Sequence, residues 1–235
     1  MRIAAAIPAY RAAGMVGDVV RRTLRIVPHL VVVDDGSDDG TGDEARAAGA
    51  RVLTHDLNRG KGAALATAFA DLFGHGCDAV VTLDADGQHR PEEIPKLVTA
   101  FAPGTGLVLG TRAHLFAQMH GVRRASNTLS SLAISAVAGR RLLDVQTGFR
   151  IYSRELWERA GMPEPRFEAE SAVVVRAARM GLPIVSVPIE MGPVDGRHTS
   201  HYRPLVDSLR IARAVSRARF EKGGRFLIFG RQGRP

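Results

Sequence analysis

The stretch that decides the fold is residues 78–89, which read DAVVTLDADGQH. The first six residues are mostly apolar or β-branched, which predicts a buried strand over residues 78–83. Two carboxylates, Asp84 and Asp86, follow this strand at once, and Gln88 comes two residues later. In sheets of parallel strands, ligands bind at the carboxyl ends of the strands. The stretch therefore predicts both a buried sheet and a ligand site at its edge.

Strand-like and helix-like segments alternate on both sides of this stretch. Short apolar runs predict further strands at residues 2–7, 30–33, 51–54, 106–110 and 184–189. Apolar residues at helical spacing predict helices at residues 14–27, 43–48, 62–73, 91–101, 123–138 and 204–222. Such alternation is typical of an α/β fold with a mostly parallel sheet and helices on both faces.

Length and composition favour one soluble-type domain with a basic surface. A chain of 235 residues is long enough for one well-cored domain. Its net charge of +8 favours phosphates, acidic lipids or nucleic acid as partners. One Trp and three Tyr offer few rings on which bases could stack, so no nucleic-acid partner is expected. Arginine outnumbers lysine 29 to 3, which a GC-rich genome would also explain.

Cysteine usage and hydropathy point to the cytoplasm. Cys77 is the only cysteine, so the chain cannot form an internal disulfide, and a reducing compartment is expected. No run of eighteen apolar residues is present, so no membrane-spanning helix is expected. The apolar run at the N-terminus meets Pro8 and has no signal-peptide cleavage site after it.

The strongest chemical signal is the pair of carboxylates after the strand at 78–83. Two carboxylates at positions i and i+2 can meet at one hard cation, and Mg²⁺ is usually held by one or two carboxylates plus substrate phosphates. An amide oxygen of Gln88 would complete the protein ligands. The alternative is a solvated acidic turn without a ligand.

Two further segments suit a nucleotide. Residues 32–41, VVDDGSDDGT, end a predicted strand in Asp34 and Asp35, whose carboxylates could accept hydrogen bonds from a base or ribose. The alternative is a turn that caps the next helix. Residues 58–64, NRGKGAA, place glycines before a helix, where backbone N–H groups can approach a phosphate closely. Gly62 follows Lys61, so the segment is not a Walker A loop.

Three later segments are weak signals when taken alone. They are residues 144–150 (DVQTGFR), 167–170 (FEAE) and 197–204 (RHTSHYRP). The arginines of the last segment could hold a pyrophosphate. Buried polar loops, helix caps and a basic surface loop are the alternatives.

In their order along the chain these segments resemble the family 2 glycosyltransferases of the GT-A fold. The match is carried by residues 7–10 (IPAY), 32–37, 58–64 and 84–89. Residues 144–150, 167–170 and 200–204 are most similar to dolichyl- and polyprenyl-phosphate mannose or glucose synthases. The resemblance covers about residues 3–210. It implies a single GT-A domain at residues 1–203, with a Rossmann-like sheet, followed by a basic amphipathic helix and tail at residues 204–235.

The resemblance also implies roles for individual residues. The nucleotide-sugar residues would be Pro8, Tyr10, Asp35, Asn58, Lys61, Asp84 and Arg197. The ligands of Mg²⁺ or Mn²⁺ would be Asp84, Asp86 and Gln88. The catalytic group would be Asp86, Gln146, Arg150, Asp144, Glu168 and Glu170. The acceptor phosphate would bind Arg112, Arg123 and Arg124. The chain departs from the family at Ala12, where an acidic residue is usual.

The implied activity is an inverting transfer of a hexose from a GDP- or UDP-hexose to a polyprenyl phosphate. A sugar hydroxyl or a small soluble acceptor is the alternative, and a non-catalytic nucleotide- or lipid-binding protein is a third. The helix at 204–222 and the apolar end at 225–229 suit peripheral contact with the inner face of the membrane. One broad apolar face is expected, made of Leu205, Leu209, Ala212, Val215 and Phe220. The alternative is an ordinary helix packed on the sheet.

Overall fold

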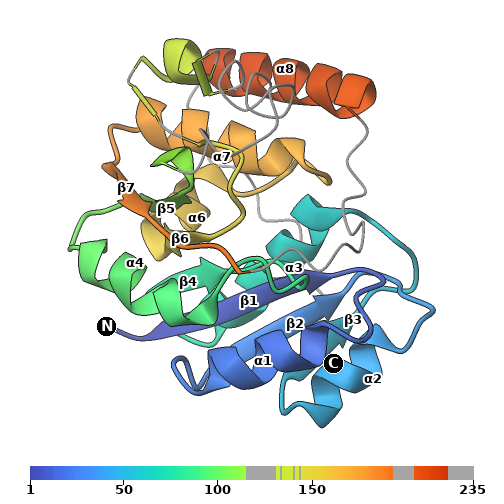
Figure 1. Cartoon of the computed structure of the whole chain (residues 1–235). Coiled ribbons are helices and arrows are strands. Elements are labelled where there is room, and N and C mark those ends of the chain that lie inside the picture. Colours follow the sequence, from blue (N-terminus) through green and yellow to red (C-terminus); the bar gives the residue numbers. More distant parts are fainter. Residues whose placement is uncertain (115–130, 133, 140, 143, 193–203, 222–235) are drawn as a thin grey trace, which may run out of the picture.

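The computed structural model describes residues 1–114, 131–132, 134–139, 141–142, 144–192 and 204–221 (Figure 1). Its centre is a seven-stranded sheet with the strand order β3-β2-β1-β4-β6-β5-β7. The strands are β1 (Ile3–Ala9), β2 (Leu30–Asp34), β3 (Arg51–Thr54), β4 (Ala79–Thr82), β5 (Leu107–Thr111), β6 (Arg150–Ser153) and β7 (Ile184–Pro188).

Helices lie between most of the strands. They are α1 (Val16–Leu24), α2 (Thr41–Ala47), α3 (Lys61–Gly74), the 3₁₀ turn η1 (Pro91–Glu93), α4 (Ile94–Ala100), α6 (Arg154–Ala160), α7 (Glu168–Arg179) and α8 (Pro204–Phe220). Residues 131–132 and 134–138 are also helical, and the first part of the helix expected at 123–138 lies outside the described residues.

The sheet is mostly parallel, as the sequence predicts. The pairs β1–β2, β1–β4, β2–β3 and β5–β7 are parallel, whereas β6 runs antiparallel to both β4 and β5. The sequence pattern does not predict β6, α6 or α7. Strand β6 is only four residues long and begins with an arginine, so its pattern offers little apolar signal.

Helices cover both faces of the sheet (Figure 1). Helices α1, α2 and α4 pack on one face, and α3, α6 and α7 pack on the other. Residues 4–7 of β1 have no exposed surface because both faces of this central strand are covered. Small side chains let α3 approach the sheet closely, and Ala64 and Ala68 are buried there.

Helix α8 packs on α7 and shares its core. Ala214, Val215 and Ala218 are buried in the same cluster as α7, and Nη1 of Arg179 donates to the carbonyl of Ala218 at 2.7 Å. The single broad apolar face expected for this helix is therefore wrong, because Val215 faces α7 while Leu209 and Phe220 are 68% and 79% exposed. The side chain of Leu205 and residues 225–229 lie outside the described part.

Candidate active site

The predicted site residues gather where several strands end at one edge of the sheet. Tyr10, Asp35 and Asp84 follow the carboxyl ends of the parallel strands β1, β2 and β4. Strand β6 is antiparallel to β4, and Arg150 pairs with Thr82. The turn that precedes β6, residues 144–149, therefore reaches the same edge and meets Asp84 there.

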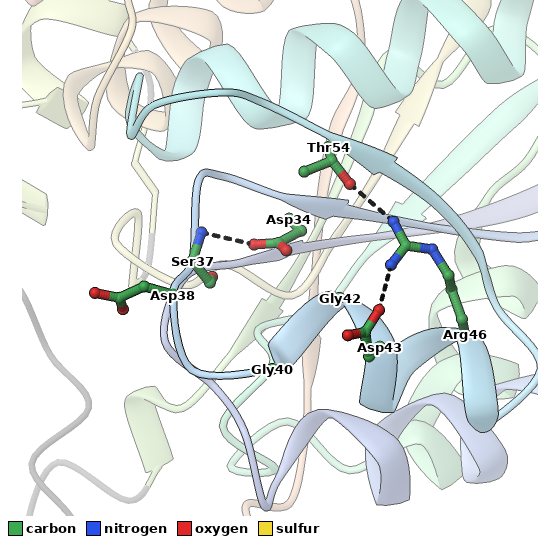
Figure 2. Close-up of a pocket in the computed structure, with 8 residues that line it drawn as sticks. All are labelled: Asp34, Ser37, Asp38, Gly40, Gly42, Asp43, Arg46 and Thr54. Atoms are coloured by element: carbon green, nitrogen blue, oxygen red, sulfur yellow. Dashed lines mark hydrogen bonds and ion pairs between the residues drawn. The ribbon is translucent and has the colours of Figure 1, made fainter.

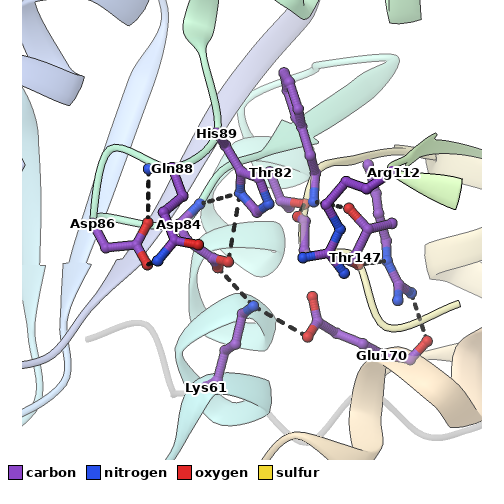
Figure 3. Close-up of polar contacts among 12 residues, drawn as sticks. Lys61, Thr82, Asp84, Asp86, Gln88, His89, Arg112, Thr147 and Glu170 are labelled. Carbon is purple, nitrogen blue, oxygen red and sulfur yellow. Dashed lines mark hydrogen bonds and ion pairs between the residues drawn. The ribbon is translucent and has the colours of Figure 1, made fainter. Parts of the chain in front are cut away.

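Asp84 lies at the centre of a polar cluster (Figure 3). Its Oδ1 is 2.7 Å from Nζ of Lys61, and its Oδ2 is 3.5 Å from Nδ1 of His89. The backbone N–H of Asp84 donates to that same Nδ1 at 3.1 Å. Burial lowers the pKa of His89, which suits a neutral ring that accepts this hydrogen bond. The His89 ring also stacks on Phe149 with centroids 5.4 Å apart.

Lys61 joins two acidic residues from different elements. Its Nζ lies 3.1 Å from Oε2 of Glu170 on α7, in addition to the contact with Asp84. Burial acts to lower the pKa of Lys61, but the two carboxylates outweigh it and the pKa is raised. Burial likewise opposes ionisation of Asp84, yet Lys61 and His89 leave the pKa of Asp84 below its usual value. Lys61 and Asp84 are accordingly charged at neutral pH, and together with Glu170 they form the Lys61–Asp84–Glu170 triad.

The backbone of Gly148 packs against this ion pair. A β-carbon at position 148 would lie 2.7 Å from Nζ of Lys61 and 2.9 Å from each carboxylate oxygen of Asp84. The Gly148 carbonyl accepts a hydrogen bond of 2.7 Å from Oγ1 of Thr82, which fixes the turn on β4. Only a residue without a side chain fits here without displacing the triad.

Arg150 binds the same turn through its backbone carbonyl groups and has no exposed surface. Its guanidinium donates to the carbonyl oxygens of Thr147, Val145 and Glu170. The resemblance implies a catalytic part for Arg150, but its guanidinium is buried and bonded to three backbone carbonyl groups. The structure gives Arg150 the part of positioning the 144–149 turn against α7. Gln146, in the same turn, is half-buried.

Arg112 forms a two-pronged ion pair with Asp144. Nε and Nη2 of Arg112 lie 2.7 and 2.8 Å from the two Asp144 oxygens, and its backbone N–H donates to Oδ2 at 2.8 Å. The Asp144 side chain has no exposure and its φ is +48°, so the pair holds it in a strained backbone conformation. Asp144 is thus bonded through both oxygens, and the charge of Arg112 is already balanced.

The predicted metal ligands form a tight turn after β4. The backbone N–H and Nε2 of Gln88 each donate to a different oxygen of Asp86, both at 3.0 Å. Within the described residues, no group of three or more His, Cys, Asp or Glu side chains is arranged to hold a metal ion. Two carboxylates fit an ion whose remaining ligands are phosphate oxygens. Asp84, whose side chain is 34% exposed, and Asp86 are the two carboxylates of this turn, and Gln88 contacts Asp86.

The residues predicted to bind the nucleotide differ in their burial and in their contacts. Asp35 is buried and accepts hydrogen bonds from the backbone N–H groups of Arg59 and Gly60 at 2.9 and 2.7 Å. Nδ1 of His55 lies 2.6 Å from the same carboxylate. Asp35 therefore fixes the loop that precedes α3 and thereby sets the position of Lys61.

The remaining residues of this group lie around the end of β1. Pro8 and Tyr10 are half-buried, and the guanidinium carbon of Arg11 is 5.4 Å from the centre of the Tyr10 ring. Ala12 is buried, and its N–H donates to Oγ1 of Thr41 at 2.7 Å. Asn58 is exposed. Arg197, Arg123 and Arg124 lie outside the described residues.

A hollow of about 280 Å³ lies beside the ends of β2 and β3 (Figure 2). Its lining residues are Asp34, Ser37, Asp38, Gly40, Gly42, Asp43, Arg46 and Thr54. Arg46 donates to both Asp43 and Thr54. Asp34, one of the two carboxylates expected to bind a nucleotide, lines this hollow, whereas none of the residues that contact Asp84 does.

Two glutamates in the first turn of α7 carry unsatisfied oxygens. Glu168 and Glu170 are 7% and 6% exposed. Oε2 of Glu168, Oε1 of Glu170 and the hydroxyl of Tyr152 are buried without a hydrogen-bond partner. No role for Tyr152 or His89 follows from the sequence, whereas the resemblance implies that the turn with Gly148 lies near the transferred sugar. The motifs that contain His89 and Gly148 were recognised, but only the structure shows that they touch Asp84.

Comparison with known proteins matches most of the chain to one family. The model described as glycosyl transferase family 2 matches residues 5–161. An undecaprenyl-phosphate mannosyltransferase from Micrococcus luteus is 31% identical over 202 residues, which are 80% of this chain and 83% of that protein. A polyprenol monophosphomannose synthase from Mycolicibacterium smegmatis is 30% identical over 201 residues, 78% of this chain and 74% of that protein.

Solved structures include enzymes of similar shape. A glucosyl-3-phosphoglycerate synthase from Mycobacterium tuberculosis, crystallised with Mn²⁺, uridine diphosphate (UDP) and phosphoglyceric acid, superposes with a TM-score of 0.69. It is 25% identical, and the match covers 92% of this chain and 76% of that one. In the described part of the present chain, no helix is long and apolar enough to span a bilayer.

Proposed function

The chain belongs to glycosyl transferase family 2, and from this premise we propose that it transfers a hexose from a nucleotide-diphosphate sugar to a polyprenyl phosphate. The family match and the neighbouring structures confirm the predicted GT-A fold and establish the chain as a glycosyltransferase. We also propose the base of the donor, the acceptor, the metal and the inverting course of the reaction.

The observation that carries the proposal is the position of Asp84 and Asp86. Both follow β4 at the edge where β1 and β2 also end, beside the ammonium of Lys61. A nucleoside diphosphate that leaves a sugar develops negative charge, and cationic groups at this edge would stabilise it. The Lys61 ammonium supplies one such charge from the chain itself.

A divalent cation suits the same place. Asp84 and Asp86 would hold Mg²⁺ or Mn²⁺, which when bound supplies Lewis-acid stabilisation of the leaving diphosphate. The neighbouring glucosyl-3-phosphoglycerate synthase was crystallised with Mn²⁺ and UDP, which supports this reading. Pro8 and Tyr10 border the nucleoside side of the edge. We keep both GDP- and UDP-hexoses as donors.

The acceptor proposal rests on the named relatives and on charge. One relative is named an undecaprenyl-phosphate mannosyltransferase and the other a polyprenol monophosphomannose synthase. A phosphomonoester is largely dianionic at neutral pH and needs cationic positioning more than a base. Arg150 is buried and Arg112 is paired with Asp144, so Arg123 and Arg124 remain the proposed acceptor residues.

A small soluble acceptor is the second candidate. The superposed synthase was crystallised with phosphoglyceric acid, which is not a lipid. A hydroxyl acceptor requires a general base because its own pKa is far above 7. Glu168 and Glu170 are buried carboxylates with unsatisfied oxygens, and Glu170 contacts Lys61, so one of the two would act as this base.

Peripheral contact with the inner face of the membrane goes with the lipid acceptor. On α8, Leu209 and Phe220 are 68% and 79% exposed. Exposed arginines flank them on the same helix, at positions 210, 213, 217 and 219. Exposed apolar side chains among arginines suit an anionic lipid surface, to which each basic residue adds about 1 kcal/mol.

The test is an activity panel with two acceptors. The full chain is incubated with UDP- and GDP-hexoses and Mn²⁺, either with polyprenyl phosphate in detergent or with 3-phosphoglycerate. We expect a glycolipid of inverted anomeric configuration only with the lipid phosphate, and no product in EDTA. Transfer to phosphoglycerate alone would favour the second candidate, and hydrolysis without transfer to either acceptor would contradict both.

A further inference from the structure

We propose that Lys61 is a placeholder for the divalent cation: its ammonium holds Asp84 until the cation arrives, and Glu170 then receives the ammonium. This inference rests on the metal site of the proposed function. In this proposal Lys61 controls the affinity for the metal, and Glu170 is the partner of Lys61 when the metal is bound. Neither role involves contact with the acceptor.

The first support is the geometry of the triad (Figure 3). Nζ of Lys61 lies 2.7 Å from Oδ1 of Asp84 and 3.1 Å from Oε2 of Glu170. The ammonium therefore lies between a carboxylate at the end of β4 and a carboxylate on α7. A small displacement exchanges the shorter contact with Asp84 for a closer one with Glu170.

The second support is the difference in exposure between the two carboxylates. The side chain of Asp84 is 34% exposed, whereas that of Glu170 is 7% exposed. A cation from solvent therefore reaches Asp84 first. Because the cation and the ammonium are both positive, they cannot both remain close to Oδ1 of Asp84 without strong repulsion.

The third support is a hydrogen-bond acceptor on Glu170 that has no donor. Oε1 of Glu170 is buried and has no hydrogen-bond partner. A buried acceptor without a donor is costly, and an ammonium has three donors to offer. Movement of Lys61 toward Glu170 would satisfy this oxygen while it releases Asp84.

The residues around the Lys61 ammonium limit where it can move when it leaves Asp84. The Gly148 backbone closes one side of the ion pair, since even a β-carbon there would lie 2.7 Å from Nζ. The Arg112 guanidinium is bonded to Asp144, so it does not compete for Asp84 at contact distance. Glu170 is thus the carboxylate that already touches Nζ besides Asp84.

The decisive experiment measures Mn²⁺ binding directly, by the electron paramagnetic resonance signal of free Mn²⁺. Lys61→Met is compared with wild type and with Lys96→Met, a matched removal of a lysine that pairs with Glu93 away from the site. We expect Lys61→Met to tighten Mn²⁺ binding about tenfold and Lys96→Met to leave it unchanged. A Lys61 that served only to hold the fold would, when removed, weaken Mn²⁺ binding.

Thermal unfolding of the same variants gives a second readout. Without cation, Lys61→Met leaves Asp84 and Glu170 facing each other unpaired, so its Tm should fall by several degrees. Saturating Mn²⁺ should close the gap to wild type because the cation replaces the ammonium on Asp84. A gap that Mn²⁺ leaves unchanged would contradict the placeholder role.

Glu170→Gln tests the receiving partner. We expect it to weaken Mn²⁺ binding about tenfold in the wild-type background and much less in Lys61→Met, where no ammonium needs a new partner. Equal effects in both backgrounds would overturn the role of Glu170. If wild type binds no Mn²⁺, either alone or with UDP or GDP, the metal site of the proposed function fails. If wild type binds Mn²⁺ and Lys61→Met does not bind it more tightly, only the present inference fails.

Discussion

The α-carbon of Gly148 packs directly on the carboxylate of Asp84, so closely that a β-carbon at position 148 would lie 2.9 Å from both oxygens. The contact joins the turn before β6 to the end of β4, two segments more than sixty residues apart along the chain. Since the atoms in the way are the ends of the Lys61 and Asp84 side chains, a larger residue would displace them without a backbone clash.

Gly148→Ala should therefore damage the site and spare the fold. We expect turnover to fall about 10²-fold, because a misplacement of about 1 Å at a reacting centre has that effect. The far-ultraviolet circular dichroism should stay unchanged. Gly74→Ala, at the end of α3 with open space around it, is the matched control and should keep full activity. Equal activity of both variants would mean that the contact is irrelevant to catalysis.

Asp86→Ala should abolish metal-dependent turnover. It removes one of the two proposed metal ligands, so we expect a loss of about 10³-fold in kcat with normal folding. Asp43→Ala removes an acidic side chain that is 88% exposed and far from Asp84, and it should behave like wild type. Transfer that continues at full rate in EDTA would disprove the metal role.

The exposed stripe of α8 should mediate vesicle binding. The double variant Leu209→Ser/Phe220→Ser keeps the buried residues Ala214, Val215 and Ala218 that attach the helix to α7. We expect its co-sedimentation with anionic vesicles to fall about tenfold, since two apolar side chains no longer enter the interface. Ser216→Ala, on the exposed side of the helix, is the control. Absence of binding by wild type would count against membrane contact.

Glu92 and Arg22 should make stability depend on pH. The hydrogen bonds from Arg22 lower the pKa of Glu92 from 4.5 to about 2. A carboxyl with a depressed folded pKa stabilises the protein above its unfolded pKa, and the effect is lost as pH falls toward 2. Glu92 is 47% exposed, so the contribution at pH 7 is at most about 1 kcal/mol. Urea unfolding of wild type and Glu92→Gln should differ by about that amount at pH 7 and by less at pH 3. A constant difference would contradict this assignment.

The sequence predicted the first half of the fold better than the second. Strands β1 to β5 carry runs of apolar residues that end in turn residues, and the expected range 51–54 coincides with β3. Strand β6 begins at Arg150, whose burial depends on three carbonyl groups supplied by the tertiary structure. No local pattern reveals that an arginine will be enclosed in this way.

The same limit applies to the site. The sequence predicts the motifs around Asp84, Lys61 and Glu170 separately, but the contact between Lys61 and Glu170 depends on α7, which the sequence pattern does not predict. The motif implies a catalytic part for Arg150, whereas the structure buries its guanidinium against three carbonyl groups, and a motif does not report burial. The unsatisfied oxygens of Glu168 and Glu170 become visible only when every neighbour has been placed.

The identity of the acceptor can be decided from the carboxylates of α7. A phosphomonoester has a second pKa of about 6 and attacks as a dianion without a base, whereas a hydroxyl must lose its proton to one. Asp144, Glu168 and Glu170 are the carboxylates of the predicted catalytic group that could act as this base. Both oxygens of Asp144 are bonded to Arg112, so Glu168 and Glu170 remain.

Glu168→Gln and Glu170→Gln should accordingly be assayed at saturating Mn²⁺ with each acceptor, so that any change in metal affinity does not enter kcat. With polyprenyl phosphate we expect a loss of kcat below about tenfold for both variants, and Arg123→Ala or Arg124→Ala should mainly raise the KM of the acceptor. With a hydroxyl acceptor, one of the two glutamine variants should lower kcat by about 10²–10⁴-fold. A loss of that size with the lipid phosphate, while donor binding stays normal, would show that a base acts in the reaction and would overturn the phosphate-acceptor mechanism.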